Sequence, residues 1–257
     1  MLKFIDTLRA LLFYAGYATI TIVWGTLSVL IAWAIPYRAR FHFIIGAWTR
    51  MVLGWLWLCC GIRHEVEGLE HIPQRACVVF VKHESTWETA MVQTLFAPQA
   101  TLIKRELLHI PFFGWAFRLL RPIAINRGDG RAALRHLIRA GKDRIDANIW
   151  VVLFPEGTRV PVGETRSFQA GGAALAQSSG APVIVVAHNG ADHWPAHQLR
   201  KRPGVIRVKV SPPIVTEGRK AKEINALAQS WLAAAMKDLA ASQTSRLTTD
   251  SAFASMN

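Results

Sequence analysis

The sequence has few acidic residues, few cysteines and one long stretch without any charge. It has 17 Asp and Glu against 30 Lys and Arg, a formal net charge of +13, and three cysteines among 257 residues. No Cys-x-x-Cys spacing occurs, so we expect reduced cysteines in a cytosol-facing protein without a structural metal. A basic chain in which 51% of residues are hydrophobic favours an anionic membrane surface over nucleic acid as a partner.

The uncharged stretch, Ala10 to Ile35, is expected to enter a membrane. At about 1.5 Å per residue a helix of this length exceeds the roughly 30 Å hydrocarbon core, so it can span the bilayer or insert at a tilt. A secretory signal, suggested by Ala32-Trp33-Ala34, would have a shorter apolar region of about 7–15 residues. A second apolar run, Phe41 to Ile62, is interrupted by Arg50 and carries tryptophans, which is typical of an interfacial or re-entrant helix. We therefore assign residues 1–62 to membrane-anchoring helices.

Beyond Arg63, short β-branched runs alternate with helix-like segments, which predicts an α/β fold. The expected architecture is a mainly parallel sheet flanked by helices, with functional groups at the carboxyl ends of the strands. Strands are predicted at His64–Glu67, Ala76–Val81, Thr101–Ile103, Ile123–Ile125, Asn148–Phe154, Val183–Ala187 and Val205–Val210. Helices are predicted at Thr86–Phe96, Phe113–Leu120, Gly130–Ile145, Gly172–Ser179 and Lys222–Leu239. This domain is assigned to 63–241, and 242–257 to a disordered tail.

A histidine and a glutamate lie where the strand Ala76–Val81 ends and a helix is expected to begin. His83 and Glu88 are five residues apart, so they point about 140° away from each other on a regular helix and can pair only across a strand-to-helix turn. In one interpretation, Ser85 and Glu88 form a capping box that starts the helix. In the other, Glu88 orients the His83 ring, whose second nitrogen takes a proton from a hydroxyl. One glutamate can serve both purposes.

Two other chemistries need residues that this segment lacks. A zinc protease site requires a second histidine one helical turn later, and "HESTWE" supplies none. A nucleophilic Ser85 would need a Gly-x-Ser-x-Gly turn, which is also absent. His83 is therefore the candidate base, and no metal is expected.

A second group of polar residues, "FPEGTR" at 154–159, follows another apolar strand. Gly157 allows backbone amides to approach a ligand closely. Glu156, Thr158 and Arg159 supply an acceptor, a hydroxyl and a forked cation. A planar guanidinium beside exposed amides suits a phosphate monoester, so this turn is a candidate phosphate site.

Further basic residues follow other β-like runs, at Lys104, Arg105 and Arg127. At strand ends such cations are either solvated rim charges or, beside Arg159, parts of an anion trap. The position in the sequence leaves both possibilities open.

Together these motifs resemble the glycerolipid acyltransferases, specifically the bacterial 1-acylglycerol-3-phosphate acyltransferases, over residues 63–213. The family's histidine, four residues and an acid are matched by His83 and Glu88, and its "FPEGTR" is matched letter for letter. The second block resembles "KRELLHIPFFG" with the later "INR", and the fourth resembles "APVIVVA". The chain departs from the family in having Glu88 for Asp, Asn126 for an acid and Val185 for a proline, and in lacking a glycine before "IAINR".

The resemblance implies acyl transfer from acyl-CoA or acyl carrier protein to the sn-2 hydroxyl of 1-acylglycerol 3-phosphate, which forms phosphatidic acid. No cofactor or covalent acyl-enzyme is implied, and the acceptor is a lipid of the cytoplasmic membrane, with the catalytic domain facing the cytoplasm. His83 would be the base and Glu88 its orienting partner. The implied substrate-binding residues are Glu156 for the glycerol backbone, Arg159 for the phosphate, and Gly157, Thr158, Lys104, Arg105 and Arg127 around them.

Three alternatives lead to different expectations. A sibling acyltransferase would use lyso-ornithine lipid, another lysophospholipid or glycerol 3-phosphate, although a phosphate-free acceptor would leave Arg159 without its main purpose. A non-catalytic lipid-binding or scaffold protein would make His83 dispensable. Nucleic-acid binding is not expected, because half of the tryptophans lie in the membrane-like segments and no recognition motif occurs.

Overall fold

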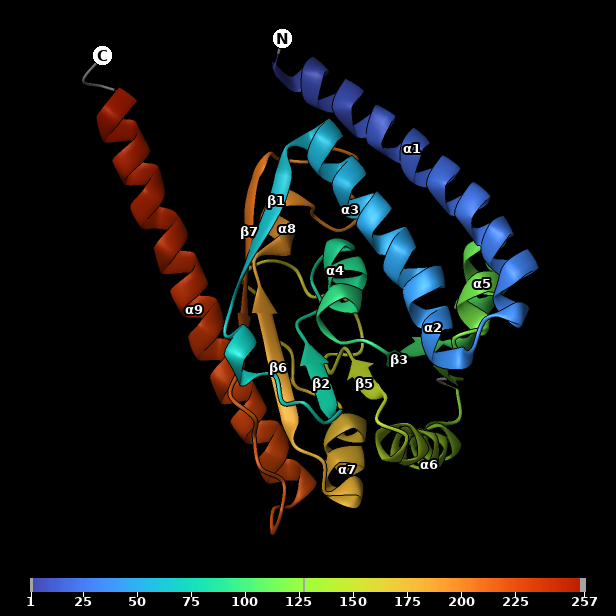
Figure 1. Ribbon diagram of the computed structural model, residues 1–257. Coiled ribbons are helices and arrows are strands. Elements are labelled where there is room, and N and C mark those ends of the chain that lie inside the picture. Colours follow the sequence, from blue (N-terminus) through green and yellow to red (C-terminus); the bar gives the residue numbers. More distant parts are fainter. Residues whose placement is uncertain (1, 127, 255–257) are drawn as a thin grey trace.

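A single mixed sheet organises the chain (Figure 1). The computed structural model describes residues 2–126 and 128–254, and the side chains of residues 4–126 and 128–242. Within these residues the sheet has the strand order β1-β7-β6-β2-β5-β3-β4, and only the β6–β7 pair is antiparallel. The strands are β1 (Ile62–Glu67), β2 (Val78–Val81), β3 (Gln99–Lys104), β4 (Ile123–Ile125), β5 (Trp150–Leu153), β6 (Val183–His188) and β7 (Gly204–Val210). The predicted mainly parallel α/β sheet is confirmed.

The central strands β2, β5 and β6 form the core because both of their faces are covered. Every residue of these three strands is buried, as expected for continuous apolar runs in a parallel sheet. β2 and β5 begin later than predicted because Asn148 lies in a turn. It adopts a φ of 56°, and its Oδ1 accepts a hydrogen bond from the Ala76 N–H at 2.8 Å.

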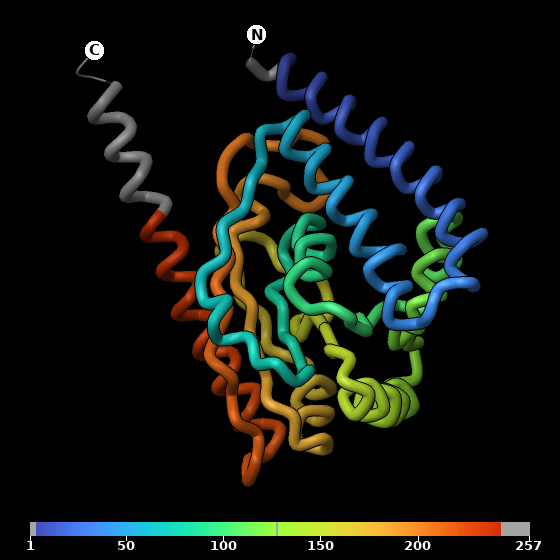
Figure 2. Tube along the Cα trace, viewed as in Figure 1, coloured from blue at the N-terminus to red at the C-terminus, as the bar shows by residue number. Residues whose placement is uncertain are grey.

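Helices cover both faces of the sheet. On one face α6, α7 and α9 pack in sequence, and on the other α3 and α4 pack with α1 and α5 outside them. Figure 2 shows α1 (blue) and α9 (red) on opposite sides of the sheet. The α-helices are α1 (Leu2–Ile31), α2 (Tyr37–Phe41), α3 (Ala47–Cys60), α4 (Trp87–Leu95), α5 (Phe113–Arg118), α6 (Gly130–Asp146), α7 (Ala170–Ser179), α8 (Gly190–His193) and α9 (Ala221–Ala254). Short turns of other helix types are η1 (Ala32–Ala34), η2 (His42–Gly46), η3 (Leu69–His71) and η4 (Arg105–His109).

The N-terminal helices pack against the domain that contains the sheet. Phe13 of α1 meets Trp194 edge to face, with ring centroids 5.0 Å apart. Lys201 Nζ donates to the Tyr14 hydroxyl at 2.8 Å. Leu56 of α3 is buried in the same apolar cluster as the central strands. Residues 1–62 therefore pack directly against the domain that was assigned to 63–241.

The outer face of α1 is exposed and apolar. Two helical segments, Phe4–Ala34 and Tyr37–Cys60, are long and apolar enough to cross a membrane. Leu30 of α1 is 62% exposed, and Trp33 of the following η1 is 74% exposed. Other exposed apolar side chains of α1 are Phe4, Ile5, Leu8, Leu11, Leu12, Ile22, Val23, Leu27, Val29 and Ile31. A surface of this size and composition indicates association with a membrane.

The C-terminal helix is longer than predicted. The sequence-based boundaries were Lys222 and Leu239, whereas the helical backbone of α9 runs from Ala221 to Ala254. The tail assigned to 242–257 thus begins inside α9. Residues 255–257 lie outside the described part of the chain.

Gly114 of α5 is predicted to tolerate no side chain. A Cβ there would lie 2.5 Å from the Leu107 carbonyl oxygen, and backbone atoms cannot move aside as a side-chain end can. We expect Gly114→Ala to lower the free energy of unfolding by about 1–3 kcal/mol. Thermal unfolding in detergent would measure the loss.

Gly54→Ala in α3 is the matched control, because a Cβ at Gly54 meets nothing within 4 Å. It should be stabilising by about 0.5–1 kcal/mol, since alanine loses less backbone freedom in a helix. Equal melting temperatures for the two variants would contradict the close packing around α5.

Candidate active site

Two neighbouring strand ends bring the predicted motifs together. β2 and β5 are adjacent and parallel, with Phe80 opposite Leu153, so the segments that follow them leave the same edge of the sheet. The segments are also bonded to each other. The Val160 N–H donates to the His83 carbonyl at 2.8 Å, and Arg159 Nε donates to the Ser85 carbonyl at 2.9 Å.

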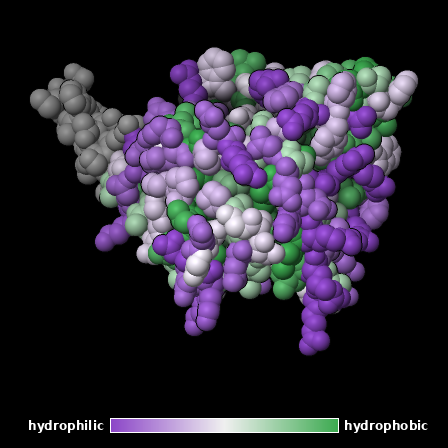
Figure 3. Space-filling model, turned by 60° about the horizontal axis from the view of Figure 1, so that its bottom comes forward, coloured by the Kyte–Doolittle hydropathy of each residue, from purple (hydrophilic) through white to green (hydrophobic). Residues whose placement is uncertain are grey.

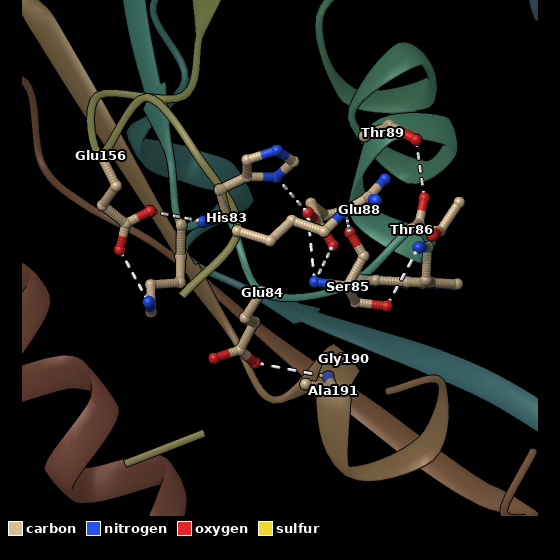
Figure 4. Close-up of polar contacts among 12 residues, drawn as sticks. His83, Glu84, Ser85, Thr86, Glu88, Thr89, Glu156, Gly190 and Ala191 are labelled. Atoms are coloured by element: carbon tan, nitrogen blue, oxygen red, sulfur yellow. Dashed lines mark hydrogen bonds and ion pairs between the residues drawn. The ribbon is translucent and has the colours of Figure 1, made fainter. Parts of the chain in front are cut away.

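His83 and Glu88 are in direct contact, as Figure 4 shows. His83 Nδ1 lies 2.7 Å from Glu88 Oε1 across the strand-to-helix turn. The Glu88 side chain is fully buried, whereas that of His83 is 16% exposed. The His83 ring stacks on Phe154 with centroids 4.3 Å apart. Among the described residues, none is a hydrogen-bond partner of His83 Nε2, so this nitrogen is available to a substrate proton.

Glu88 also helps to hold the helix start. Its two carboxylate oxygens lie 3.3 and 3.0 Å from the Ser85 backbone nitrogen, which is the glutamate half of the predicted capping box. The other half differs, because α4 begins at Trp87 and its N-cap residue is Thr86. Ser85 Oγ accepts instead from the Trp87 N–H at 3.1 Å. The two interpretations of Glu88 are therefore compatible in one geometry.

Glu156 is turned into the protein. Its side chain is 2% exposed, and Oε1 lies 2.7 Å from the Nζ of Lys82, itself a buried residue. Oε2 accepts from the His83 N–H, also at 2.7 Å. Both oxygens thus already bind protein groups, so the carboxylate supports the segment that carries His83. The role that the resemblance implied for Glu156, holding the glycerol backbone, stays a prediction.

His188, a buried histidine that the motif analysis did not single out, completes this support. Its Nε2 lies 2.9 Å from the Lys82 carbonyl oxygen, and its Nδ1 accepts from the Gly190 N–H at 3.0 Å. The ring is therefore an Nε2–H tautomer that donates to Lys82. The peptide between Lys82 and His83 is held at its carbonyl by His188 and at its N–H by Glu156. In the sequence, His188 is a polar residue at the end of the apolar run of β6, just as His83 follows the apolar run of β2. This position is the signal by which His188 could have been identified.

A second carboxylate, Glu84, lies beneath the same turn. The Ala191 N–H donates to its Oε1 at 3.4 Å, and His188 Nδ1 is 3.7 Å from that oxygen. Burial raises the pKa of the Glu84 carboxyl above its ordinary value, and the nearby Lys82 ammonium opposes the shift. Glu84 is thus part of the buried polar layer under the site rather than of its open surface.

The rest of the "FPEGTR" turn faces outward. Gly157 has a φ of 75°, a left-handed conformation that glycine adopts without strain, and this turns the chain after Glu156. Thr158 is exposed and Arg159 is partly buried. The bond from Nε to Ser85 fixes the arginine, while its two terminal nitrogens have no hydrogen-bond partner within the described residues. They remain available to an anion.

The other predicted cations are less closely tied to the site. Lys104 and Arg105 are exposed at the carboxyl end of β3, which is separated from β2 by β5. They share the sheet edge with His83 without a direct contact to it. Arg127 lies outside the described residues. Within those residues no group of three or more His, Cys, Asp and Glu side chains could hold a metal ion.

A His–Glu pair and an "FPEGTR" turn at neighbouring strand ends of this sheet define an acyltransferase. The acyltransferase family model matches residues 63–189. A 1-acyl-sn-glycerol-3-phosphate acyltransferase of Pseudomonas aeruginosa is 42% identical, with 91% of this chain and 93% of the relative covered. One of Limnanthes alba is 32% identical over 76% of this chain and 69% of the relative.

A solved structure extends the comparison to the fold. The crystal structure of the 1-acyl-sn-glycerophosphate acyltransferase PlsC from Thermotoga maritima matches with a TM-score of 0.79 and 25% identity, covering 94% of this chain and 98% of that one. The chain belongs to the 1-acyl-sn-glycerol-3-phosphate acyltransferase family. The recognition made from the motifs is confirmed.

The buried Lys82–Glu156 pair generates a stability prediction. Glu156→Gln leaves the Lys82 ammonium buried without its counter-charge, so the free energy of unfolding should fall by about 3–5 kcal/mol. Adding Lys82→Met removes the stranded charge and should restore most of that loss. Thermal or denaturant unfolding of the single and double variants measures both effects.

Glu164→Gln is the control, because Glu164 is an exposed residue on the same loop. It should change stability by less than about 0.5 kcal/mol. If the double variant were as unstable as Glu156→Gln alone, the pair would not be the source of the loss.

Proposed function

We propose that this acyltransferase moves a fatty acyl group from a thioester donor to the sn-2 hydroxyl of 1-acylglycerol 3-phosphate, giving phosphatidic acid. The relatives are 1-acyl-sn-glycerol-3-phosphate acyltransferases, which supports this acceptor. The observation that carries the proposal is the His83–Glu88 contact of 2.7 Å, with the opposite ring nitrogen of His83 left open in a partly exposed position. That is the arrangement a general base needs.

In the proposed mechanism His83 Nε2 takes the proton of the acceptor hydroxyl as its oxygen attacks the thioester carbonyl. The buried Glu88 carboxylate holds the ring through Nδ1 and stabilises its charged form. The tetrahedral intermediate then collapses, the carbon–sulfur bond breaks, and the leaving thiolate takes the proton back from His83. The product ester and free thiol balance the reaction without a cofactor or an acyl-enzyme.

The phosphate of the acceptor is assigned to Arg159. Its Nε is bound to Ser85, within the segment that carries His83, so the phosphate and the base keep a constant separation. Lys104 and Arg105 are proposed to add positive charge along the same sheet edge, and Arg127 stays a proposed phosphate-binding residue from its position in the sequence. For Glu156 we propose a positioning role through the His83 N–H, because its carboxylate is buried.

The acceptor reaches the site from the membrane, and we propose that α1 lies along the membrane face instead of crossing the bilayer freely. It touches the catalytic domain near its middle and again toward its C-terminal end. Tyr14 binds Lys201, and a Cβ on Gly25 would lie 2.9 Å from the Phe112 carbonyl oxygen. A helix that left the domain to cross the bilayer would lose one of these contacts. We assign the enzyme to the cytoplasmic membrane, with its catalytic domain on the cytoplasmic side.

A direct test uses purified enzyme in mixed micelles with a panel of acceptors and both donors, acyl-CoA and acyl carrier protein. We expect a product of the mass of phosphatidic acid from 1-acylglycerol 3-phosphate. A higher kcat/KM for lyso-ornithine lipid or glycerol 3-phosphate would replace the proposed acceptor. A lack of product with every acceptor would reject the function.

Glu88→Gln separates orientation of His83 from helix capping. Glutamine can still accept from the Ser85 N–H but lacks the charge that stabilises protonated His83. Turnover should fall by about 10²–10⁴-fold with little change in melting temperature. Glu88→Asp should keep part of the activity, since the family ordinarily has aspartate there. Wild-type turnover in Glu88→Gln would leave Glu88 as a helix cap only.

Arg159→Lys tests the phosphate contact. An ammonium cannot reproduce two parallel hydrogen bonds to one phosphate, so KM for 1-acylglycerol 3-phosphate should rise by roughly tenfold or more. A phosphate-free acceptor, monoacylglycerol, serves as the control, and its weaker reaction should be unaffected. Steady-state kinetics that leave the acceptor KM unchanged in both Arg159→Lys and Arg159→Ala would remove Arg159 from the site.

A further inference from the structure

We propose that the outward face of α6 is a docking surface for an acidic carrier protein that bears the acyl thioester. This rests on the proposed function, in which the acyl donor is a thioester. Four residues of α6, here called the basic ridge, form this face: Arg131, Arg135, Arg139 and Lys142.

The basic ridge is a continuous line of positive charge. At 100° per residue its four side chains fall within about 80° around the helix axis, and all four are exposed. Asp143 and Asp146 are close in sequence, at the C-terminal end of the helix. Within the described residues, however, no carboxylate forms an ion pair with any of the four. The ridge therefore presents its charge to solvent without neutralisation.

Packing fixes the direction in which the ridge faces. Leu137, Gly141 and Ile145 lie on a different side of α6, centred about 120° around the helix axis from the ridge, and are buried. The approach to α7 is close, because a Cβ on Gly141 would lie 2.5 Å from Leu175 Cδ2. Leu134, at 37% exposure, is the large apolar side chain of α6 that reaches the surface. A helix that lies in a membrane interface presents an apolar face to the lipid, and here that face is buried in the protein.

The ridge also lies away from the apolar face of α1. Figure 1 shows α1 along the upper right of the molecule and α6 at the lower right, with α2 between them. Figure 3 looks toward the lower face, where hydrophilic side chains cover much of the surface and several project from its edge. When the apolar face of α1 contacts lipid, α6 is left facing the aqueous phase. A soluble acidic protein fits this position better than the bilayer does.

The distances suit a donor with a flexible prosthetic arm. α6 follows β4, the third strand from β2 along the sheet, so its first turn is displaced roughly 14 Å sideways from the strand that carries His83. From Arg131 to Lys142 the ridge extends about 16 Å. A line of charge this long matches the face of an acidic protein helix, whereas the clustered phosphates of a nucleotide would occupy only part of it.

The test replaces all four ridge residues with glutamine, a good helix former, and compares two donors carrying the same acyl chain, acyl carrier protein and acyl-CoA. The control enzyme carries four glutamines at exposed basic positions near or on α9: Arg219, Lys220, Lys222 and Lys237. We expect the ridge variant to lose about tenfold or more of kcat/KM with acyl carrier protein at low salt, because charge steering raises association rates by 10–10³. With acyl-CoA it should stay within about twofold of wild type, as should the control with both donors.

The other outcomes overturn the proposal in distinguishable ways. Equal losses with the two donors would mean that the ridge acts on the site itself or on the phosphates of CoA. A matching loss of binding to anionic vesicles would assign the ridge to the membrane. Wild-type enzyme that uses acyl-CoA but not acyl carrier protein would reject the docking surface and leave the proposed function intact. Failure with both donors would reject the proposed function itself.

Discussion

The peptide unit between Lys82 and His83 is the constraint on which the site depends. His188 from the end of β6 binds its carbonyl, and Glu156 from the segment after β5 binds its N–H. Since β5 and β6 are the two neighbours of β2 in the sheet, each flanking strand contributes one of these contacts. A peptide plane held at both polar ends leaves His83 little backbone freedom. The remaining mobility of the base is removed by Glu88 and Phe154 at the ring.

This arrangement explains why the site sits on a buried polar layer. Lys82, Glu84, Glu88, Glu156 and His188 are each less than 5% exposed. Buried charges are tolerated when each has a partner at hydrogen-bond distance, and Lys82 has one in Glu156. Burying these groups costs free energy of folding. In return, the backbone is rigid at His83, the one point where a proton must be transferred. Above this layer the His83 ring edge, Thr158 and Arg159 reach the surface.

The departures from the family pattern have local explanations. The longer side chain of Glu88 reaches both His83 and the Ser85 N–H. Val185 replaces a common proline, and its N–H donates to Ser211 Oγ at 2.8 Å, a bond that proline could not make. Asn126 accepts from the Gly128 N–H at 3.1 Å and so shapes the turn after β4. None of these changes disturbs the contact between His83 and Glu88.

The sequence by itself determined the class of fold, the element types and the two motifs, because each depends on local patterns. In the sequence, the buried strands are unbroken apolar runs, and polar residues follow them. Only the tertiary structure decided which strand ends are neighbours, and therefore that His188 supports Lys82 and that Glu156 points inward. These are contacts between residues roughly 70 to 110 positions apart, and no local spacing encodes them. Packing against α7 likewise decided on which side α6 presents its charge. The helical period of the sequence shows that α6 has an apolar face and a charged face, but it does not show which neighbouring element covers the apolar face.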